Sequence, residues 1–181
     1  TAGSTAAARC RAKGWKVAII DSLPFGGTCA LRGCEPKKVL VEASKIIDSN
    51  HRHEGKGISN SEAIHINWSD LIRFKRTFTE SFPKHREDGF IISGIVPFHG
   101  HAKFIGLNKV KVEYNDGSSK GNKNNNNSNT AVLDGKYILI ATGAKPINLN
   151  IPGSETIITS DKFLEIENDN LPKKNKFIGG G

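Results

Sequence analysis

The feature that most constrains the fold is a short apolar run placed directly after a helical segment. Residues 4–13 are rich in alanine and lack proline, which favours a helix, and Gly14 suits its C-terminal end. The strand-like run Lys16–Ile20 follows at once and ends in Asp21. A helix, a buried strand and an acid at the strand's end form the second half of a βαβ dinucleotide-binding unit, in which the acid accepts hydrogen bonds from a ribose. This order predicts an α/β fold.

Two further segments have apolar residues at helical spacing, residues 35–50 and residues 68–88. Between residues 91 and 112, short apolar runs are interrupted by glycine and proline, which predicts strands and turns. The asparagine-rich stretch 116–130 is poor in apolar residues, and we interpret it as the flexible tip of a hairpin.

A second buried strand is predicted over Tyr137–Ala141, where apolar residues return as a short run. The run ends in Thr142-Gly143, a turn of small residues at which a ligand can approach the backbone. The apolar runs are far shorter than the ~18 residues that a membrane-spanning helix needs. A membrane protein is therefore not expected.

Composition and charge narrow the class of protein further. The 181 residues include 26 Lys and Arg against 18 Asp and Glu, a net charge of +8. The basic residues are interspersed with acids and have no stacking aromatic residues among them, so we expect no nucleic-acid partner. Three cysteines are too few for a disulfide-stapled secreted domain, and no signal peptide opens the chain. These observations favour a reducing, cytoplasmic location.

The motif with the most potentially reactive groups is Gly26-Gly27-Thr28-Cys29 followed by Cys34. On a regular helix two cysteines five positions apart are separated by about 7.5 Å of rise, beyond the roughly 4.4–6.8 Å of a disulfide. A redox pair here therefore requires a distorted turn, which Gly33 permits. Proximity to a helix N-terminus and to lysines predicts a lowered thiol pKa. A structural disulfide or half of a metal site are the alternatives, and no metal is predicted.

This segment resembles the redox-active segment of the FAD-dependent pyridine nucleotide-disulfide oxidoreductases, the family of glutathione reductase, dihydrolipoamide dehydrogenase and mercuric reductase. The resemblance extends over the whole chain. It includes Thr1-Ala2-Gly3 (end of an FAD fingerprint), Asp21 (ribose acid), His101-Ala102 (adenine contact), Ala141-Thr142-Gly143 (second FAD turn), Thr159-Ser160-Asp161 (connection) and Gly179-Gly180-Gly181 (opening of the next fingerprint).

The resemblance implies a Rossmann-like, doubly wound FAD-binding domain with an inserted antiparallel β-meander, truncated at both ends. The FAD-binding domain would cover residues 1–150, a connection 151–171, and the start of an NAD(P)-binding domain 172–181. The first strand of the sheet would lie before Thr1. On this basis we expect the isolated 181 residues to bind FAD weakly or not at all.

The resemblance also implies an electron relay from NAD(P)H through FAD to the Cys29–Cys34 disulfide and on to a disulfide or thiol-reactive substrate. Cys29 would attack the substrate, Cys34 would lie against the flavin, and Lys37 would lie near flavin N5. The residues implied to bind FAD are Thr1, Ala2, Gly3, Asp21, Gly27, Thr28, Cys29, Lys37, Lys38, Ala102, Thr142 and Gly143. Gly179 and Gly181 would contact NAD(P). The full-length enzyme would be a homodimer, whose His-Glu acid pair lies outside this chain.

Two departures from the family pattern bear on the substrate. Ala30-Leu31-Arg32-Gly33 replaces the Val/Leu-Asn-Val-Gly common between the cysteines, and Ala8-Arg9 retains half of an arginine pair that many glutathione reductases use for peptide carboxylates. A glutathione-reductase-like activity stays the main expectation. The alternatives are a dihydrolipoamide dehydrogenase-like or mercuric reductase-like member, a non-catalytic FAD-binding electron carrier, and a basic interaction module.

Overall fold

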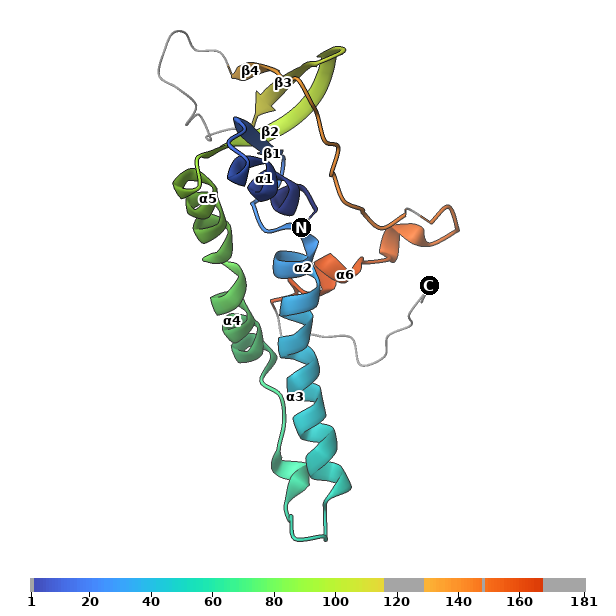
Figure 1. Cartoon of the computed structure of the whole chain (residues 1–181). Helices are drawn as coiled ribbons and strands as arrows, with labels where there is room; N and C mark the ends of the chain where they lie inside the picture. The colour runs from blue at the N-terminus through green and yellow to red at the C-terminus, as the bar shows by residue number, and fades with distance from the viewer. Residues whose placement is uncertain (1, 116–128, 148, 168–181) are drawn as a thin grey trace.

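The computed structural model describes residues 2–115, 129–147 and 149–167 (Figure 1). The elements in chain order are α1 (Ala2–Ala12), β1 (Val17–Asp21), α2 (Gly27–Arg32), α3 (Cys34–Arg52), η1 (Ser61–Ala63), α4 (Trp68–Thr79), α5 (Phe82–Ile92), β2 (Ile95–Gly106), β3 (Lys109–Tyr114), β4 (Thr130–Asp134), η2 (Ser154–Thr156) and α6 (Ser160–Phe163). Helices thus lie between the first two strands, as in an α/β protein, and three consecutive strands follow.

A mixed four-stranded sheet organises the fold, in the order β1-β2-β3-β4. β1 and β2 are parallel and are joined by a crossover that contains α2 to α5. β2, β3 and β4 then run antiparallel as a meander. The α/β fold class with an inserted meander is therefore confirmed.

β2 changes its partner at Gly100. Residues 95–99 pair with β1, and Gly100 begins the ladder with β3. A Cβ atom on the buried Gly100 would lie 2.8 Å from the carbonyl carbon of Glu113 and 3.0 Å from Tyr114 Cα, which no side chain tolerates. The missing side chain lets the two strand backbones approach closely at this junction.

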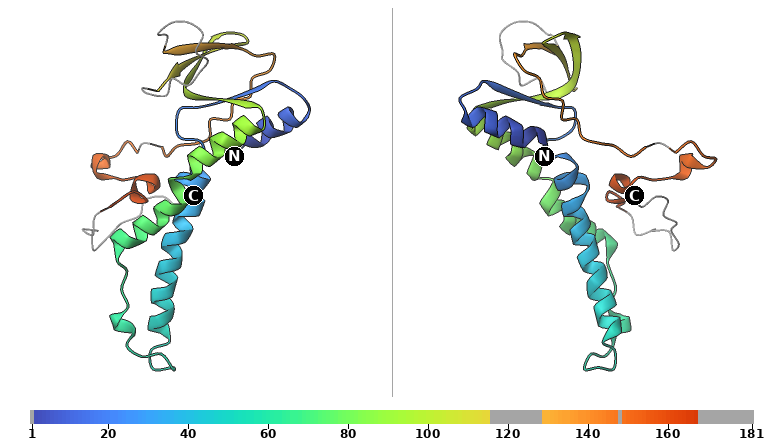
Figure 2. Two further views of the ribbon diagram at one scale, coloured as in Figure 1. Left: turned by 90° about the vertical axis from the view of Figure 1, so that its left-hand side faces the viewer. Right: turned by 45° about the vertical axis from the view of Figure 1, so that its right-hand side comes forward.

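The core lies on one face of the parallel pair. It consists of Ala7 from α1, Phe25 from the loop after β1, Phe90 from α5 and Ile95 from β2. Phe25 and Phe90 meet edge to face, with ring centroids 5.4 Å apart. α1 and α5 therefore cover the same face of the strands, as both views of Figure 2 show. This packing holds both helices against the strands.

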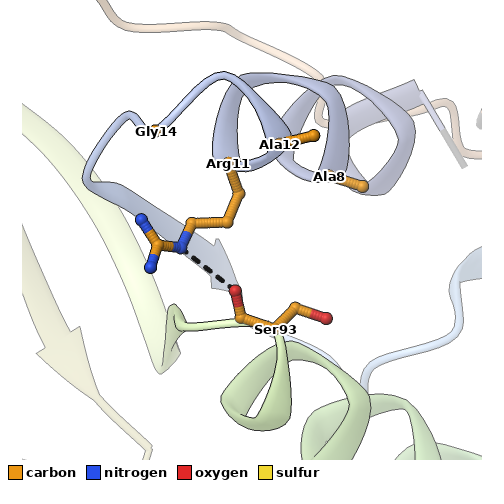
Figure 3. A pocket seen from close by; sticks show the side chains of 5 residues that line it. All are labelled: Ala8, Arg11, Ala12, Gly14 and Ser93. Atoms are coloured by element: carbon orange, nitrogen blue, oxygen red, sulfur yellow. Dashed lines mark hydrogen bonds between the residues drawn. The ribbon is translucent and has the colours of Figure 1, made fainter.

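Arg11 joins the C-terminal ends of α1 and α5. Its Nε donates to the carbonyl oxygen of Ser93 at 3.1 Å, and its Nη1 donates to that of Trp15 at 3.2 Å. Figure 3 shows the guanidinium in a shallow surface hollow lined by Ala8, Ala12 and Gly14. A cation at two helix C-termini satisfies carbonyls that have no partner within the helices.

The helical predictions are confirmed with one change. Residues 35–50 lie within α3, but the stretch 68–88 divides into α4 and α5 around Glu80 and Ser81. Pro83 explains the division, because it has no N–H to donate to the preceding turn and is tolerated only in the first turn of a new helix. α3 and α4 run together as a long two-helix arm away from the sheet (Figure 1).

The prediction of a buried strand over Tyr137–Ala141 is wrong. The segment is extended without strand pairing, and the side chains of Tyr137, Leu139 and Ile140 are 67%, 64% and 68% exposed. An apolar run forms a buried strand only beside a strand that shares its hydrogen bonds, and no described strand pairs with this one. The predicted loop tip lies largely outside the described residues, because 116–128 are not among them.

Within the described residues, no helix is both long enough and apolar enough to cross a membrane.

Replacing Arg11 with alanine should lower the free energy of unfolding of the intact protein by about 1–2 kcal/mol, because two charge-assisted hydrogen bonds to helix ends are lost. Arg9→Ala on the same helix is the matched control, since the side chain of Arg9 is exposed and forms no hydrogen bond or ion pair with the described residues. Urea unfolding followed by circular dichroism measures both variants. Equal losses for the two variants would contradict the stabilising role of Arg11.

Candidate redox site

The two cysteines lie on either side of a helix break. Cys29 is in α2 and Cys34 is the first residue of α3, with Gly33 between the helices. Gly33 has φ −150° and ψ −108°, so the backbone leaves helical geometry there and α3 begins at the next residue. The first hydrogen bond of α3 runs from Lys37 N–H to the Gly33 carbonyl at 3.0 Å. The distorted turn predicted for a working cysteine pair is therefore present.

Gly33 also makes a close approach that a side chain would obstruct. A Cβ atom at this position would lie 3.0 Å from the backbone oxygen of Thr28 and 3.4 Å from its Cγ2. Thr28 directly precedes Cys29, so the space beside Gly33 controls how near the end of α2 lies to the start of α3.

Both cysteines are exposed free thiols, and they face each other. A hydrogen bond with Cys34 raises the pKa of Cys29, and partial desolvation and the charge of Glu35 raise it further. The predicted lowering of the pKa is therefore wrong for Cys29. The neighbouring thiol outweighs Lys38, the one cation that lowers this pKa. The two thiols thus share a hydrogen bond that favours the protonated form of Cys29.

The two lysines after the cysteines differ in their surroundings. Lys38 Nζ lies 2.9 Å from Glu35 Oε1, and this ion pair raises the pKa of Lys38. Much of the charge of Lys38 is thus directed to Glu35 rather than to the thiols. The exposed side chain of Lys37 makes no hydrogen bond or ion pair with another described residue.

Two segments predicted to bind one ligand, although far apart in sequence, meet in the structure. A Cβ atom on Gly3 in the first turn of α1 would lie 3.4 Å from Cβ of Ala141, which directly precedes Thr142-Gly143. Gly143 has φ +76°, and both turn residues are exposed. The beginning of α1 also lies near α2 (Figures 1 and 2). Backbone N–H groups at such helix starts favour phosphate groups.

Asp21 lies at the C-terminal end of β1, opposite His99 of β2. Its Oδ1 accepts a hydrogen bond from Leu23 N–H at 3.0 Å, so it also closes the turn after the strand. Ala102 is exposed on the meander part of β2 and pairs with Val112. The structure places Asp21 and Ala102 on neighbouring strands rather than in contact.

Three predicted site residues, Thr1, Gly179 and Gly181, lie outside the described residues. Ala2 is exposed at the beginning of α1. In the part of the chain that the structure describes, no group of three or more His, Cys, Asp or Glu side chains is arranged to hold a metal ion.

The sequence analysis missed a set of charged contacts beside α2. Lys75 of α4 is fully buried, and Arg32 lies close enough to Asp161 to help lower the pKa of that acid. The burial of Lys75 was predictable from the sequence, because Lys75 shares helical spacing with Ile72 and Thr79 on the buried side of α4. No local signal indicated the partner of Arg32.

Comparison with known proteins decides the family. The family model of the pyridine nucleotide-disulphide oxidoreductases matches residues 1–181. The chain belongs to this family. Its relatives include a glutathione reductase of Schizosaccharomyces pombe (strain 972 / ATCC 24843), 35% identical over 182 residues, and one of Burkholderia cepacia, 32% identical over 180 residues. Each alignment covers 99% of this chain, which spans 37% and 36% of the length of these relatives.

Gly33→Ala should slow disulfide formation between the cysteines about tenfold, because the new methyl group pushes against the Thr28 carbonyl and displaces α2 from α3. Gly89→Ala is the control, since Gly89 lies within α5 and has open space around it. The measurement is the time course of disulfide formation in a glutathione redox buffer, read by alkylation and mass spectrometry. Equal rates for both variants would show that the close approach at Gly33 is unimportant.

Alkylation of Cys29 in the reduced protein should have a midpoint above the ordinary thiol range, because Cys34 stabilises the protonated form. In Cys34→Ala the midpoint should move to lower pH. In Lys38→Gln it should move slightly in the opposite direction, because Lys38 lowers this pKa. Iodoacetamide labelling of the Cys29 peptide at several pH values measures the shifts. An unchanged midpoint in Cys34→Ala would contradict the shared proton.

Proposed function

We propose that this chain is the FAD-binding part of an NAD(P)H-dependent disulfide oxidoreductase that acts on a glutathione-like disulfide. The observation that carries the proposal is the facing thiol pair at the helix break, in a chain that belongs to a disulfide oxidoreductase family. The similarity to two glutathione reductases supports the substrate class.

The described residues fit an FAD molecule. The close contact between Gly3 and Ala141 brings the first turn of α1 and the turn at Thr142-Gly143 to one place, where the backbone is open to a phosphate group. Asp21 at the end of β1 would accept hydrogen bonds from the ribose, Ala102 would meet the adenine, and Gly27 and Thr28 would lie on the pyrophosphate side. When bound, FAD would supply two-electron transfer between NAD(P)H and the cysteine pair.

The cysteines would reduce the substrate in two exchange steps. Cys29, after losing its proton, attacks one sulfur of the substrate disulfide, forms a mixed disulfide and releases the first thiolate, which takes up a proton. The thiolate of Cys34 then attacks Cys29 Sγ, releases the second substrate thiol and closes the Cys29–Cys34 disulfide. The two electrons of the dithiol thus pass to the substrate, and each leaving thiolate gains one proton.

The lysines would act electrostatically, by placing positive charge near the flavin, rather than as nucleophiles. Lys37 is free of ion pairs with described residues, and its proposed place is beside flavin N5. Lys38 is held by Glu35, so its proposed effect on the same site is weaker.

The remaining roles extend beyond the described residues. Gly179 and Gly181 would open the site for NAD(P)H, and the enzyme would act as a cytoplasmic homodimer. We propose a small disulfide as the substrate, and glutathione disulfide is the first to test. The choice within this class stays open because the chain departs from the family pattern at Ala30-Leu31-Arg32-Gly33 and retains only Arg9 of the arginine pair.

The proposal predicts that the intact protein binds FAD and oxidises NAD(P)H with glutathione disulfide as acceptor. Anaerobic two-electron reduction should produce a long-wavelength absorption band from a thiolate against the flavin, and Cys34→Ser should abolish both the band and turnover. Cys10→Ser is the control, since Cys10 lies on α1 away from the pair, and it should retain both. A flavin that bleaches identically in the parent and Cys34→Ser would favour the electron-carrier alternative.

A further inference from the structure

The segment Ser160–Glu167, which we name the brace, lies beside α2, the helix that carries Cys29, and is attached to α4. It contains α6 and ends at the last described residue. Figure 1 shows α6 beside α2, and the contacts below join the rest of the brace to α4. None of these contacts takes part in the proposed thiol chemistry.

The first contact is a buried cation. Lys75 of α4 is 0% exposed, and its Nζ donates to the Leu164 carbonyl and to Glu165 Oε1, both at 2.7 Å. Leu164 is itself buried. A buried ammonium group is tolerated only with good partners, and both of the partners found for Lys75 come from the brace. The position of α4 is therefore tied to that of the brace.

Neighbouring residues of α4 repeat the attachment. Trp68 Nε1 donates to the Ile166 carbonyl at 2.8 Å, and its ring packs against Phe163 with centroids 5.9 Å apart. Arg76 forms an ion pair with Glu167 and lies 3.8 Å from Glu165 Oε2. Residues of α4 from Trp68 to Arg76 thus contact the brace.

The other side of the brace faces α2. A cleft of about 240 Å³ is lined by Leu31 and Arg32 of α2, by Arg76 and Thr79 of α4 and by Glu165 of the brace, among others. A hydrogen bond with Thr159 is the main cause that lowers the pKa of Asp161, and the charge of Arg32 adds to it. Oδ1 of Asp161 is buried and has no hydrogen-bond partner among the described residues. Arg32 is three residues after Cys29 and directly precedes the break at Gly33.

We propose that the brace fixes the angle between α2 and α3, with Lys75 and Arg32 as positioning residues for the Cys29–Cys34 pair. On the α2 side the brace shares one cleft with Leu31 and Arg32, and on the α3 side it is attached to α4, the helix that packs against α3. This inference rests on the proposed function, because it assumes that the pair cycles between dithiol and disulfide. Loosening the brace widens the angle at Gly33 and disfavours the disulfide relative to the dithiol.

The test is the thiol–disulfide equilibrium of the pair in the intact protein. The protein is equilibrated in buffers of reduced and oxidised dithiothreitol, in which each protein disulfide formed reduces one molecule of the cyclic oxidant. Lys75→Met and Glu165→Gln should lower the equilibrium constant for disulfide formation about three- to tenfold, the range for residues that act through a packed network. Lys75→Arg, which retains the cation, should recover most of the parent value.

Two further variants separate positioning from general destabilisation. Asp88→Asn removes an ion pair with Lys84 on α5, away from the brace, and should leave the equilibrium unchanged. Asp161→Asn tests the side of the brace that faces α2. It leaves the buried Lys75 unchanged, so it tests the inference even where Lys75→Met does not fold. Thermal unfolding is recorded for every variant. A change in the thiol–disulfide equilibrium counts for the brace only when the control, at a similar loss of thermal stability, does not show it.

The outcomes are distinct. A lowered constant in Glu165→Gln and Asp161→Asn, with a parent-like value in Asp88→Asn, supports the brace. Parent-like values in all variants overturn it while the proposed function stands. A parent protein that forms no Cys29–Cys34 disulfide overturns the proposed function, and the brace with it.

Discussion

The helix break at Gly33 is the constraint on which the candidate site depends. On a continuous helix, residues five apart are rotated by about 140° around the axis, so Cys29 and Cys34 would point away from each other. The break interrupts the helical geometry, and α3 starts anew with Cys34 as its first residue. It also places the thiols close enough to share a proton. The pair exists because one residue without a side chain separates two helices.

The sheet supplies the fixed frame around this break. A small core of Ala7, Phe25, Phe90 and Ile95 attaches α1 and α5 to one face of the parallel strands. Phe25 belongs to the short loop that leads from β1 to α2, so the core also anchors the start of the cysteine-bearing segment. The contact of Gly3 with Ala141 then brings the two turns expected to bind FAD to one place.

The sequence predicts local elements well and their partners poorly. α1, β1 and α3 follow from apolar spacing and glycine placement, because those signals lie within each element. The interruption of α4 and α5 at Pro83 was hidden by apolar residues that keep helical spacing on both sides of it. The strand predicted over Tyr137–Ala141 failed because an apolar run contains no information about a neighbouring strand. Lys75 and Glu165 meet across 90 positions, beyond any local pattern.

The thiol pKa shows the same limit in chemical terms. Sequence proximity placed lysines near the cysteines and predicted a lowered pKa, but Lys38 is paired with Glu35, and the nearest group to Cys29 is another thiol. Because the hydrogen bond with Cys34 favours the protonated form of Cys29, this thiol has a smaller thiolate fraction at neutral pH and is less reactive. The hydrogen bond between the thiols depends on how α2 and α3 meet at Gly33, so the geometry of the helix break and the pKa of Cys29 are linked.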